Sequence, residues 1–201
     1  MVSVSATFDK DSVGGEQVVD DMISAYEFAD NDVYRAVTHN KGVMNGTISV
    51  ANATGQDSRA IEAAAHAYAS HTGRYRSLTH WSKNNDGHLV GKFEIPLSVG
   101  IVGGVTNNHP IAKICTKILN LKNVQELSCI IASTGLAQNF AAMRALATEG
   151  IQKGHMKMHL LNMLNQLGAT EEEKRKMVKH FKDETVTNAS VKEALERIKS
   201  K

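Results

Sequence analysis

Residues 135–150 have the sequence GLAQNFAAMRALATEG, which carries the clearest helical pattern in the chain. Leu136, Phe140, Met143 and Ala147 recur at a spacing that places side chains on one face of a helix. Gly150 follows, and glycine is the residue that most often ends a helix. We therefore predict a long helix here, packed by strands and other helices, as the central helix of the fold.

Strands and helices are predicted on both sides of this central helix. At the start of the chain, Val2, Val4, Ala6 and Phe8 alternate with small or polar residues, as in a half-buried strand. Further strands are predicted at 47–53, 89–95 and 127–133, and further helices at 18–26, from 57 onward and at 111–119. Residues 98–110 are predicted to form a glycine-rich loop. This mixture indicates an α+β fold.

The last quarter of the chain has a different character. Leu160, Leu161, Leu164 and Leu167 form an apolar stripe that ends at Gly168. Two capping boxes follow, at 170–173 and 190–193, and each is predicted to begin a short charged helix. We predict two domains, 1–153 and 154–201, of which the second is a small helical appendage with little core of its own.

Composition limits the classes of protein that are compatible with the sequence. The chain has 201 residues and a formal net charge of +2, so it gives no reason to expect a nucleic-acid or membrane surface. The first residues lack the pattern of a signal peptide, and no stretch has the ~20 apolar residues that span a bilayer. Cys115 and Cys129 lie in apolar contexts, so we expect both to be reduced core residues of a soluble cytoplasmic protein.

The segment Thr38–Gly46, with the sequence THNKGVMNG, is the first candidate for a catalytic site. Gly42 and Gly46 would let a loop bend tightly around Lys41 and bring Asn45 near it. An ammonium held in this way can stabilise a carbonyl oxygen that gains negative charge during a reaction. A lysine in a solvated loop is the alternative, and spacing alone does not decide between the two.

Two further residues are candidates for the same chemistry. Asp57 follows Thr-Gly-Gln at a predicted helix start, so it is either an N-cap or the partner of a buried lysine. His155, in GIQKGHM, could deliver a proton near neutral pH. The other histidines considered are expected at the surface: His39, His66, His71, His80, His88, His159 and His180. No HExxH spacing suggests zinc, and GIVGGV is not a convincing dinucleotide fingerprint.

Three motifs together resemble a known family. HNKGVMNG at 39–46, ATGQDSRAIEA at 53–63 and GLAQNFAAMRALATEGIQKGHM at 135–156 are similar, in order and spacing, to class II (bacterial-type) 3-hydroxy-3-methylglutaryl-coenzyme A reductase. The resemblance covers roughly residues 1–165 and implies the C-terminal part of the large catalytic domain, followed by a helical flap. It also implies reduction of a thioester by two hydride transfers from NADPH or NADH, which yields mevalonate and free coenzyme A.

The resemblance also assigns roles to individual residues. Lys41 resembles the lysine that stabilises the oxyanion, Asp57 the aspartate that hydrogen-bonds this lysine, and His155 the flap histidine that protonates the departing thiolate. The positions of Arg35 and Asn139 resemble those that hold the hydroxymethylglutaryl group, and that of Asn45 resembles one near the lysine. The resemblance thus gives six candidate site residues: Lys41, Asp57 and His155 for catalysis, and Arg35, Asn45 and Asn139 for substrate binding.

The family pattern also has parts without a counterpart here. Neither the catalytic glutamate nor the small domain that binds the nicotinamide cofactor is found in the sequence. We therefore expect a chain that is inactive alone, either a truncated gene product or one half of a split enzyme that a separate N-terminal reductase chain completes. The resemblance also implies a homo-oligomer, because the family builds its site at a dimer interface. A non-catalytic CoA-ester-binding or assembly remnant is the alternative, and an unrelated structural α/β domain is a third reading.

Overall fold

The computed structural model describes residues 1–148, 150–182, 184 and 186–199, without the side chains of residues 107 and 151–158. The chain divides into two compact units, Met1–Thr148 and Glu149–Lys201. The first unit contains β1 (Val2–Phe8), α1 (Lys10–Val13), α2 (Glu16–Asn31), α3 (Val33–Ala53), α4 (Ser58–Ala69), β2 (Thr79–Lys83), β3 (Leu89–Ile95), α5 (Gly104–Asn108), α6 (Pro110–Leu119) and α7 (Val124–Ala147). The second contains α8 (Ile151–Gln166), α9 (Glu171–His180) and α10 (Asn188–Lys199). The predicted α+β class is confirmed.

The three strands form an antiparallel sheet in the order β1-β3-β2. Strand β1 pairs along its whole length with β3, from Val2 opposite Ile95 to Phe8 opposite Leu89. One face of β3 is buried at alternate positions, as the period of a strand requires when one side of a sheet covers a core. Strand β2 was not among the predicted strands, although it brings Thr79 and Trp81 into the core.

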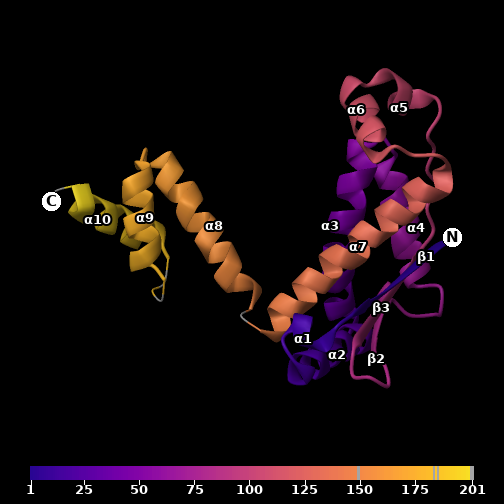
Figure 1. Ribbon diagram of the computed structural model, residues 1–201, viewed down its shortest axis with the longest axis horizontal. Helices are drawn as coiled ribbons and strands as arrows, with labels where there is room; N and C mark the ends of the chain where they lie inside the picture. Colours follow the sequence, from indigo (N-terminus) through magenta and orange to yellow (C-terminus); the bar gives the residue numbers. More distant parts are fainter. Residues whose placement is uncertain (149, 183, 185, 200–201) are drawn as a thin grey trace. The chain divides into compact units, whose positions relative to one another are not determined.

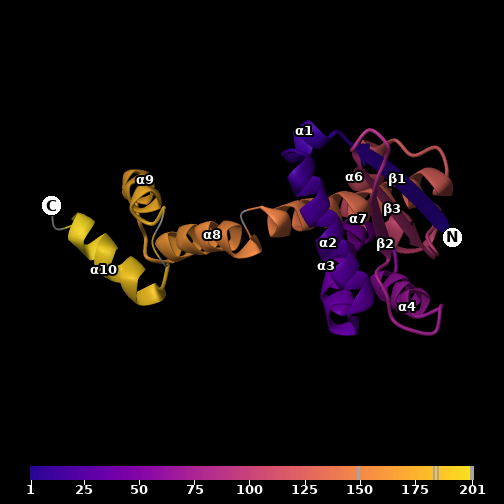
Figure 2. The same cartoon turned by 90° about the horizontal axis from the view of Figure 1, so that it is seen from below.

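Helix α7 is the central element of the first unit (Figures 1 and 2). It packs against α2 and α3 and also against β1 and β3. Its buried residues continue the predicted helical face toward the N-terminus through Leu127, Ile131 and Ala132. The strand predicted at 127–133 was therefore wrong. These residues form the first turns of α7, because the helical face that contacts α3 extends through them.

Helix α3 corrects a second prediction. The strand expected at 47–53 lies in the last turns of α3, and the tight loop expected around Lys41 lies in its middle. The buried positions recur at helical spacing, at Ala36, Asn40, Val43 and Thr47. Two of these four are polar, so apolar periodicity alone does not mark the helix. Packing against α7 has decided the structure of a segment with mixed local preference.

The glycines of α3 have different surroundings. A Cβ atom built on Gly46 would lie 2.5 Å from the backbone oxygen of Thr134 in α7. Facing it, a Cβ on Gly135 would collide with the hydroxyl of Thr47. By contrast, a Cβ on Gly42 would meet nothing within 4 Å. Gly46 and Gly135 thus allow the close approach of α3 and α7, whereas Gly42 makes no such contact.

This difference predicts opposite effects for the same substitution in one helix. Gly46→Ala should lower the free energy of unfolding by about 1–3 kcal/mol, because the methyl group must push α7 away. Gly42→Ala should raise it by about 0.5–1 kcal/mol, because alanine is the better helix former and the site has room. Urea unfolding of the two variants and the wild type measures both effects. Equal effects of the two substitutions would contradict the close packing of α3 on α7.

The second unit has a hydrophobic core of its own, contrary to the expectation of little core. Leu160 and Leu164 from α8 pack with Met177 and Phe181 from α9 and the adjoining turn, and with Leu195 from α10. The stripe predicted at 160–167 is thus the side of α8 that meets the other two helices. Within this unit the three helices form a single core, and nothing is needed from the first unit to bury these side chains.

The two predicted capping boxes had different outcomes. The box at Thr170 and Glu173 is confirmed, with both reciprocal hydrogen bonds formed. The box at 190–193 was wrong, because α10 begins earlier, at Asn188, and Thr187 caps it by accepting a hydrogen bond from the Ser190 amide. A capping pattern can be recognised in the sequence, but the sequence does not show which of several nearby hydroxyl groups occupies the N-cap position.

Removal of the Thr170 cap should be felt only by the second unit. Thr170→Ala is expected to lower the stability of that unit by about 1 kcal/mol, because one amide at the start of α9 loses its acceptor. Hydrogen exchange at the amides of α9 measures the loss, with those of β3 as an internal reference. Asn162→Ala, on the exposed side of α8, is the control that should leave the α9 amides unchanged.

The two cysteines differ in exposure. Cys129 is exposed and Cys115 partly exposed, so the expectation that both are core residues was wrong for Cys129. Both thiols are free. Among the described residues, no helix is long and apolar enough to cross a membrane.

Candidate active site

Helix α3 presents one side to solvent and the other to the core. Lys41 and Asn45 are separated by one helical turn and are both exposed, so they share the outer side. His39 and Asn40, immediately before the lysine, point inward and are buried. The segment HNKG therefore combines anchoring residues with an exposed ammonium on the same turn of helix.

Asn40 holds this turn against the segment that leads into β2. Its side-chain nitrogen donates to the backbone oxygen of Arg76 (2.8 Å), and its side-chain oxygen accepts from the amide of Leu78 (2.9 Å). The Asn40 side chain thus makes the hydrogen bonds that a neighbouring strand would make to these two backbone groups. Without it, both groups would be unpaired inside the protein. The contact fixes the rotation of α3 and, with it, the direction in which Lys41 projects.

His39 anchors the same turn through a buried hydrogen-bond network. Its Nε2 lies 2.7 Å from the Thr79 hydroxyl, and that hydroxyl donates to the side-chain oxygen of Asn139 (3.0 Å). Trp81 donates to the same oxygen (2.8 Å). Because the Thr79 proton is used toward Asn139, His39 must donate from Nε2, so its Nδ1 is unprotonated. Nδ1 is buried, without a partner in the described part of the chain.

Burial makes protonation of this imidazole unfavourable. Burial and, to a smaller extent, the positive charge of Arg35 lower the pKa of His39 from 6.5 to about 4, against an opposing effect of the Asp30 carboxylate. His39 is only 3% exposed, so its assignment to the surface was wrong. The reason is tertiary: Thr79, its hydrogen-bond partner, comes from β2, forty residues away.

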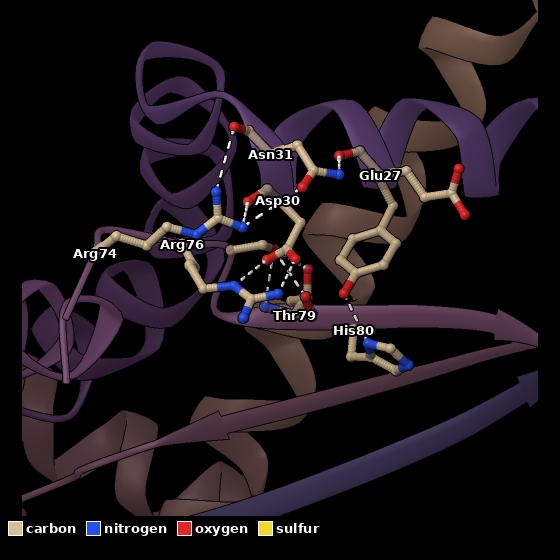
Figure 3. A network of polar contacts seen from close by, with 9 residues as sticks. Glu27, Asp30, Asn31, Arg74, Arg76, Thr79 and His80 are labelled. Carbon is tan, nitrogen blue, oxygen red and sulfur yellow. Dashed lines mark hydrogen bonds and ion pairs between the residues drawn. The ribbon is translucent and has the colours of Figure 1, made fainter. Parts of the chain in front are cut away.

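A neighbouring ionic network holds the segment that bears Thr79 (Figure 3). The Arg76 guanidinium pairs with the Asp30 carboxylate at the end of α2, and this partner lowers the pKa of Asp30. Arg74 donates to the backbone oxygen of Asp30 (3.1 Å), and Tyr26 hydrogen-bonds His80 (2.7 Å). Together these contacts tie the end of α2 to the start of β2, the strand on which the His39 network depends.

The outer side of α3 and the facing side of α4 form an open groove of about 480 Å³. Lys41, Asn45 and Asn52 line it from α3, and Glu62 and His66 from α4. Met44, Ile48 and Ser49 complete the α3 wall. The groove therefore brings an ammonium, a carboxylate, an imidazole and two amides together beside apolar side chains. Lys41 Nζ forms no hydrogen bond or ion pair within the described ranges.

Glu62 and His66 were not among the predicted site residues. His66 lies on the exposed side of α4, as expected for a surface histidine, and its Nδ1 is 2.7 Å from the Tyr75 hydroxyl. The signal that could have found both residues is their i, i+4 spacing in RAIEAAAHAYA, which places them on one helix face. The direction of that face, toward α3, is a tertiary feature.

Asp57 does not meet Lys41 within one chain. It is exposed and caps α4, with its carboxylate accepting from the Ala60 amide (3.0 Å). Lys41 lies twelve residues before Ala53, the last residue of α3, which is about 18 Å along the helix axis at 1.5 Å per residue. Asp57 lies beyond that end. Of the two readings weighed from sequence, the N-cap is the one seen here.

The other predicted residues are distributed over the two units. Arg35 is half-buried at the start of α3, where burial lowers its pKa and its guanidinium donates to the Thr38 hydroxyl (3.1 Å). Asn139 is buried in α7 within the His39 network. His155 belongs to α8, and its side chain lies outside the described residues. Lys41 and Asn45 are thus the two predicted residues that line one groove.

No group of three or more His, Cys, Asp or Glu side chains that could hold a metal ion occurs among the residues that the structure describes.

The known proteins whose sequences are similar to this chain agree in their description. The sequence profile of the family described as hydroxymethylglutaryl-coenzyme A reductase matches residues 2–160. A 3-hydroxy-3-methylglutaryl-coenzyme A reductase from Archaeoglobus fulgidus is 48% identical over 201 residues, which is 100% of this chain and 46% of the relative. A probable reductase of the same name from Borreliella burgdorferi is 45% identical over 147 residues, 73% of this chain and 33% of the relative.

The structural comparison agrees with the sequence comparison. The class II reductase from Streptococcus pneumoniae, solved bound to NADPH in open conformations, has a TM-score of 0.72 and 37% sequence identity, and the match covers 98% of this chain and 49% of that one. The chain thus spans about half the length of these relatives, or less. The profile match and the identity along the full chain lead to one conclusion: this chain belongs to the hydroxymethylglutaryl-coenzyme A reductase family.

Proposed function

We propose that this chain supplies the lysine-bearing part of a hydroxymethylglutaryl-coenzyme A reductase active site. The reaction converts the thioester of hydroxymethylglutaryl-CoA to the alcohol of mevalonate and releases coenzyme A. The observation that supports this most directly is the groove between α3 and α4, where the Lys41 ammonium, which has no partner among the described residues, and the Asn45 amide face Glu62 and His66.

In this proposal Lys41 acts on the carbonyl oxygen of the thioester. An ammonium without a competing partner can stabilise the negative charge that this oxygen gains when a hydride adds to the carbonyl carbon. Arg35, on the same helix, suits the carboxylate end of the substrate, because a guanidinium can pair with a carboxylate through two hydrogen bonds. Asn45 would donate a further hydrogen bond near the lysine. Asn139 is retained as a proposed substrate contact on the resemblance alone, since in this structure it is buried and its side-chain oxygen accepts from Thr79 and Trp81.

A second polypeptide is needed to complete the site. Asp57 and Lys41 of one chain are too far apart to pair, so in the proposed enzyme Asp57 approaches the lysine of another copy. The α3 surface next to Lys41 also carries exposed apolar residues, with Tyr34 85% exposed and Val37 46%. Such residues are costly to leave in water and are typical of a surface that another chain covers. A homo-oligomer or a separate N-terminal reductase chain would supply this cover.

The nicotinamide cofactor is assigned to other parts of the enzyme. When bound, it would supply the two hydrides of the reaction, and the related Streptococcus pneumoniae structure contains NADPH. The glycine-rich segment of this chain does not fit a phosphate cradle. The Gly100 amide already donates to the Gln56 side chain (2.8 Å), and the following helix α5 has only five residues. We therefore assign no cofactor-binding residue here.

The second unit is proposed as the flap of this enzyme, with a boundary near residue 154. His155, at the start of α8, would protonate the thiolate of coenzyme A as it departs, and the short charged helices behind it would exclude water from the thioester. Coenzyme A esters should slow hydrogen exchange in α9 and α10 of the assembled enzyme. Unchanged exchange would count against this role.

Reconstitution tests the proposal. The isolated chain should not oxidise NADPH with hydroxymethylglutaryl-CoA, and addition of the part of the Archaeoglobus fulgidus relative that lies outside the matched region should restore oxidation. Mevalonate formation by the isolated chain would contradict the proposed division of the site. Binding of the CoA ester by the assembled pair, without any reduction, would favour the alternative of a non-catalytic CoA-ester-binding remnant.

A further inference from the structure

The hairpin of α5 and α6 carries an exposed apolar face that the proposed active site does not use. Ile111, Ile114 and Ile118 recur on one side of α6 at i, i+3 and i+7 and are 57%, 54% and 76% exposed. Val102 and Val105, just before α6, are also exposed. Only Ala112 of α6 is buried. An amphipathic helix that turns its apolar side outward marks a surface for another polypeptide.

The face is held in place by its attachment to the end of α3. Gln56 makes two hydrogen bonds with the backbone of Gly100, one through its side-chain oxygen and one through its nitrogen (2.8 Å each). The Thr106 hydroxyl donates to the backbone oxygen of Thr54 (3.2 Å), and Ala112 packs close to Gly55. These contacts fix the hairpin from behind and leave the isoleucines free, so the face exists before any partner arrives.

A cavity of about 640 Å³ lies beside the isoleucines. Ile114, Pro110 and Leu121 contribute apolar walls, and Lys113 and Lys117 border it. A large apolar side chain from a partner can enter such a space and anchor a helix laid along α6. The cavity and the stripe together have the form of a helix-binding groove.

The charge around the face selects the partner. Residues 95–125 contain three lysines, Lys113, Lys117 and Lys122, and no aspartate or glutamate. Lys113 and Lys117 are neighbours at i, i+4, where like charges repel, and neither forms an ion pair within the residues that the structure describes. Because a second copy would place lysines against lysines, the charge argues against self-association through this face. It favours an acidic partner.

We propose that this face binds an acidic amphipathic helix from the half of a class II reductase that the chain does not match. The chain covers 46% of its Archaeoglobus fulgidus relative, so about half of that enzyme lies outside the match and must pack against the half that this chain represents. The inference rests on the proposed function, in which a second polypeptide completes the site. It adds the surface by which that polypeptide is held, whose lining cavity shares no residue with the Lys41 groove.

The test measures complex formation rather than activity. The full chain is mixed with the unmatched part of the Archaeoglobus fulgidus relative, expressed as a separate polypeptide, and affinity is measured by titration calorimetry. Lys113→Glu/Lys117→Glu should weaken binding about tenfold at low salt, with the loss shrinking as salt rises. Ile114→Asp/Ile118→Asp should weaken it at least as much at any salt.

The matched control is Lys182→Glu/Lys192→Glu, which changes the net charge equally but lies in the second unit. Circular dichroism and thermal unfolding of every variant check that the first unit remains folded. Wild-type affinity in both face variants would overturn the inference, as would a homodimer of the chain that Ile114→Asp/Ile118→Asp dissociates. Because these readouts need no turnover, a pair that binds through this face but fails to reduce substrate would overturn only the proposed function.

Discussion

Lys41→Ala should lower the rate of NADPH oxidation by the reconstituted pair by about 100- to 1,000-fold, the range seen when one group that stabilises an oxyanion is removed. The loss should fall mainly on kcat, because the ammonium interacts most strongly with the charge that develops in the transition state. Binding of hydroxymethylglutaryl-CoA should change much less. Steady-state kinetics with varied substrate separates the two effects.

The substitution should leave the fold intact, so a loss of activity would report on the ammonium itself. Lys41 is exposed and alanine is a good helix former, so α3 loses no contact within the described part of the chain. Lys92→Ala is the matched control, because Lys92 is an exposed lysine on β3 outside the groove. Equal activity of the Lys41 and Lys92 variants would refute the role of the ammonium. A raised KM with unchanged kcat would assign Lys41 to substrate binding alone.

The stability of the first unit should fall in mild acid because of His39. Its pKa is about 4 in the folded protein and 6.5 as the reference value for the unfolded chain, so the folded state disfavours protonation. The contribution of His39 to stability is therefore fully present above pH 6.5 and is lost as the pH falls from 6.5 toward 4. The difference of about 2.5 pKa units corresponds to about 3 kcal/mol at the acid end.

Urea unfolding at several pH values between 7.5 and 4.5 measures this loss. In His39→Gln the amide nitrogen can still donate to Thr79, but nothing titrates, so the slope between pH 6.5 and 4.5 should become much shallower even if the variant is less stable overall. His109→Gln, at an exposed position, should retain the wild-type slope. A wild-type slope in His39→Gln would show that His39 is not the group that titrates. At still lower pH, protonation of Asp30 adds a separate loss, since its pKa is lowered by Arg76.

Elements with an apolar buried face were predictable from sequence. The strands at 2–8 and 89–95, the helix that contains 18–26, the helix that begins after Asp57 and the central helix at 136–147 all lie where their patterns placed them. In each of these elements the residues that face the core are mainly apolar. The helix at 111–119 was also predicted, but its isoleucines are exposed. Such signals need no knowledge of distant parts of the chain.

Helix α3 was missed because its buried face is partly polar. His39, Asn40 and Thr47 occupy positions that an apolar pattern would need, and Gly46 lowers the local preference for a helix. Each is tolerated because of a distant partner: Thr79 for His39, the backbone at 76–78 for Asn40, and the close approach of α7 for Gly46. The same dependence explains why the loop expected around Lys41 is a helix.

The sequence by itself determined which groups are available for chemistry: the lysine, the asparagine one turn later, the aspartate after Thr-Gly-Gln, and the three motifs that identify the family. Tertiary structure alone decided that Lys41 and Asn45 face Glu62 and His66, that Asp57 caps α4 without lining their groove, and that His39 is a neutral core residue. The physical reason is that identity and spacing are local properties of the chain. Burial, pairing and proton affinity depend on which distant segments meet, and here the packing of α3 against α7, α4 and the start of β2 decides that.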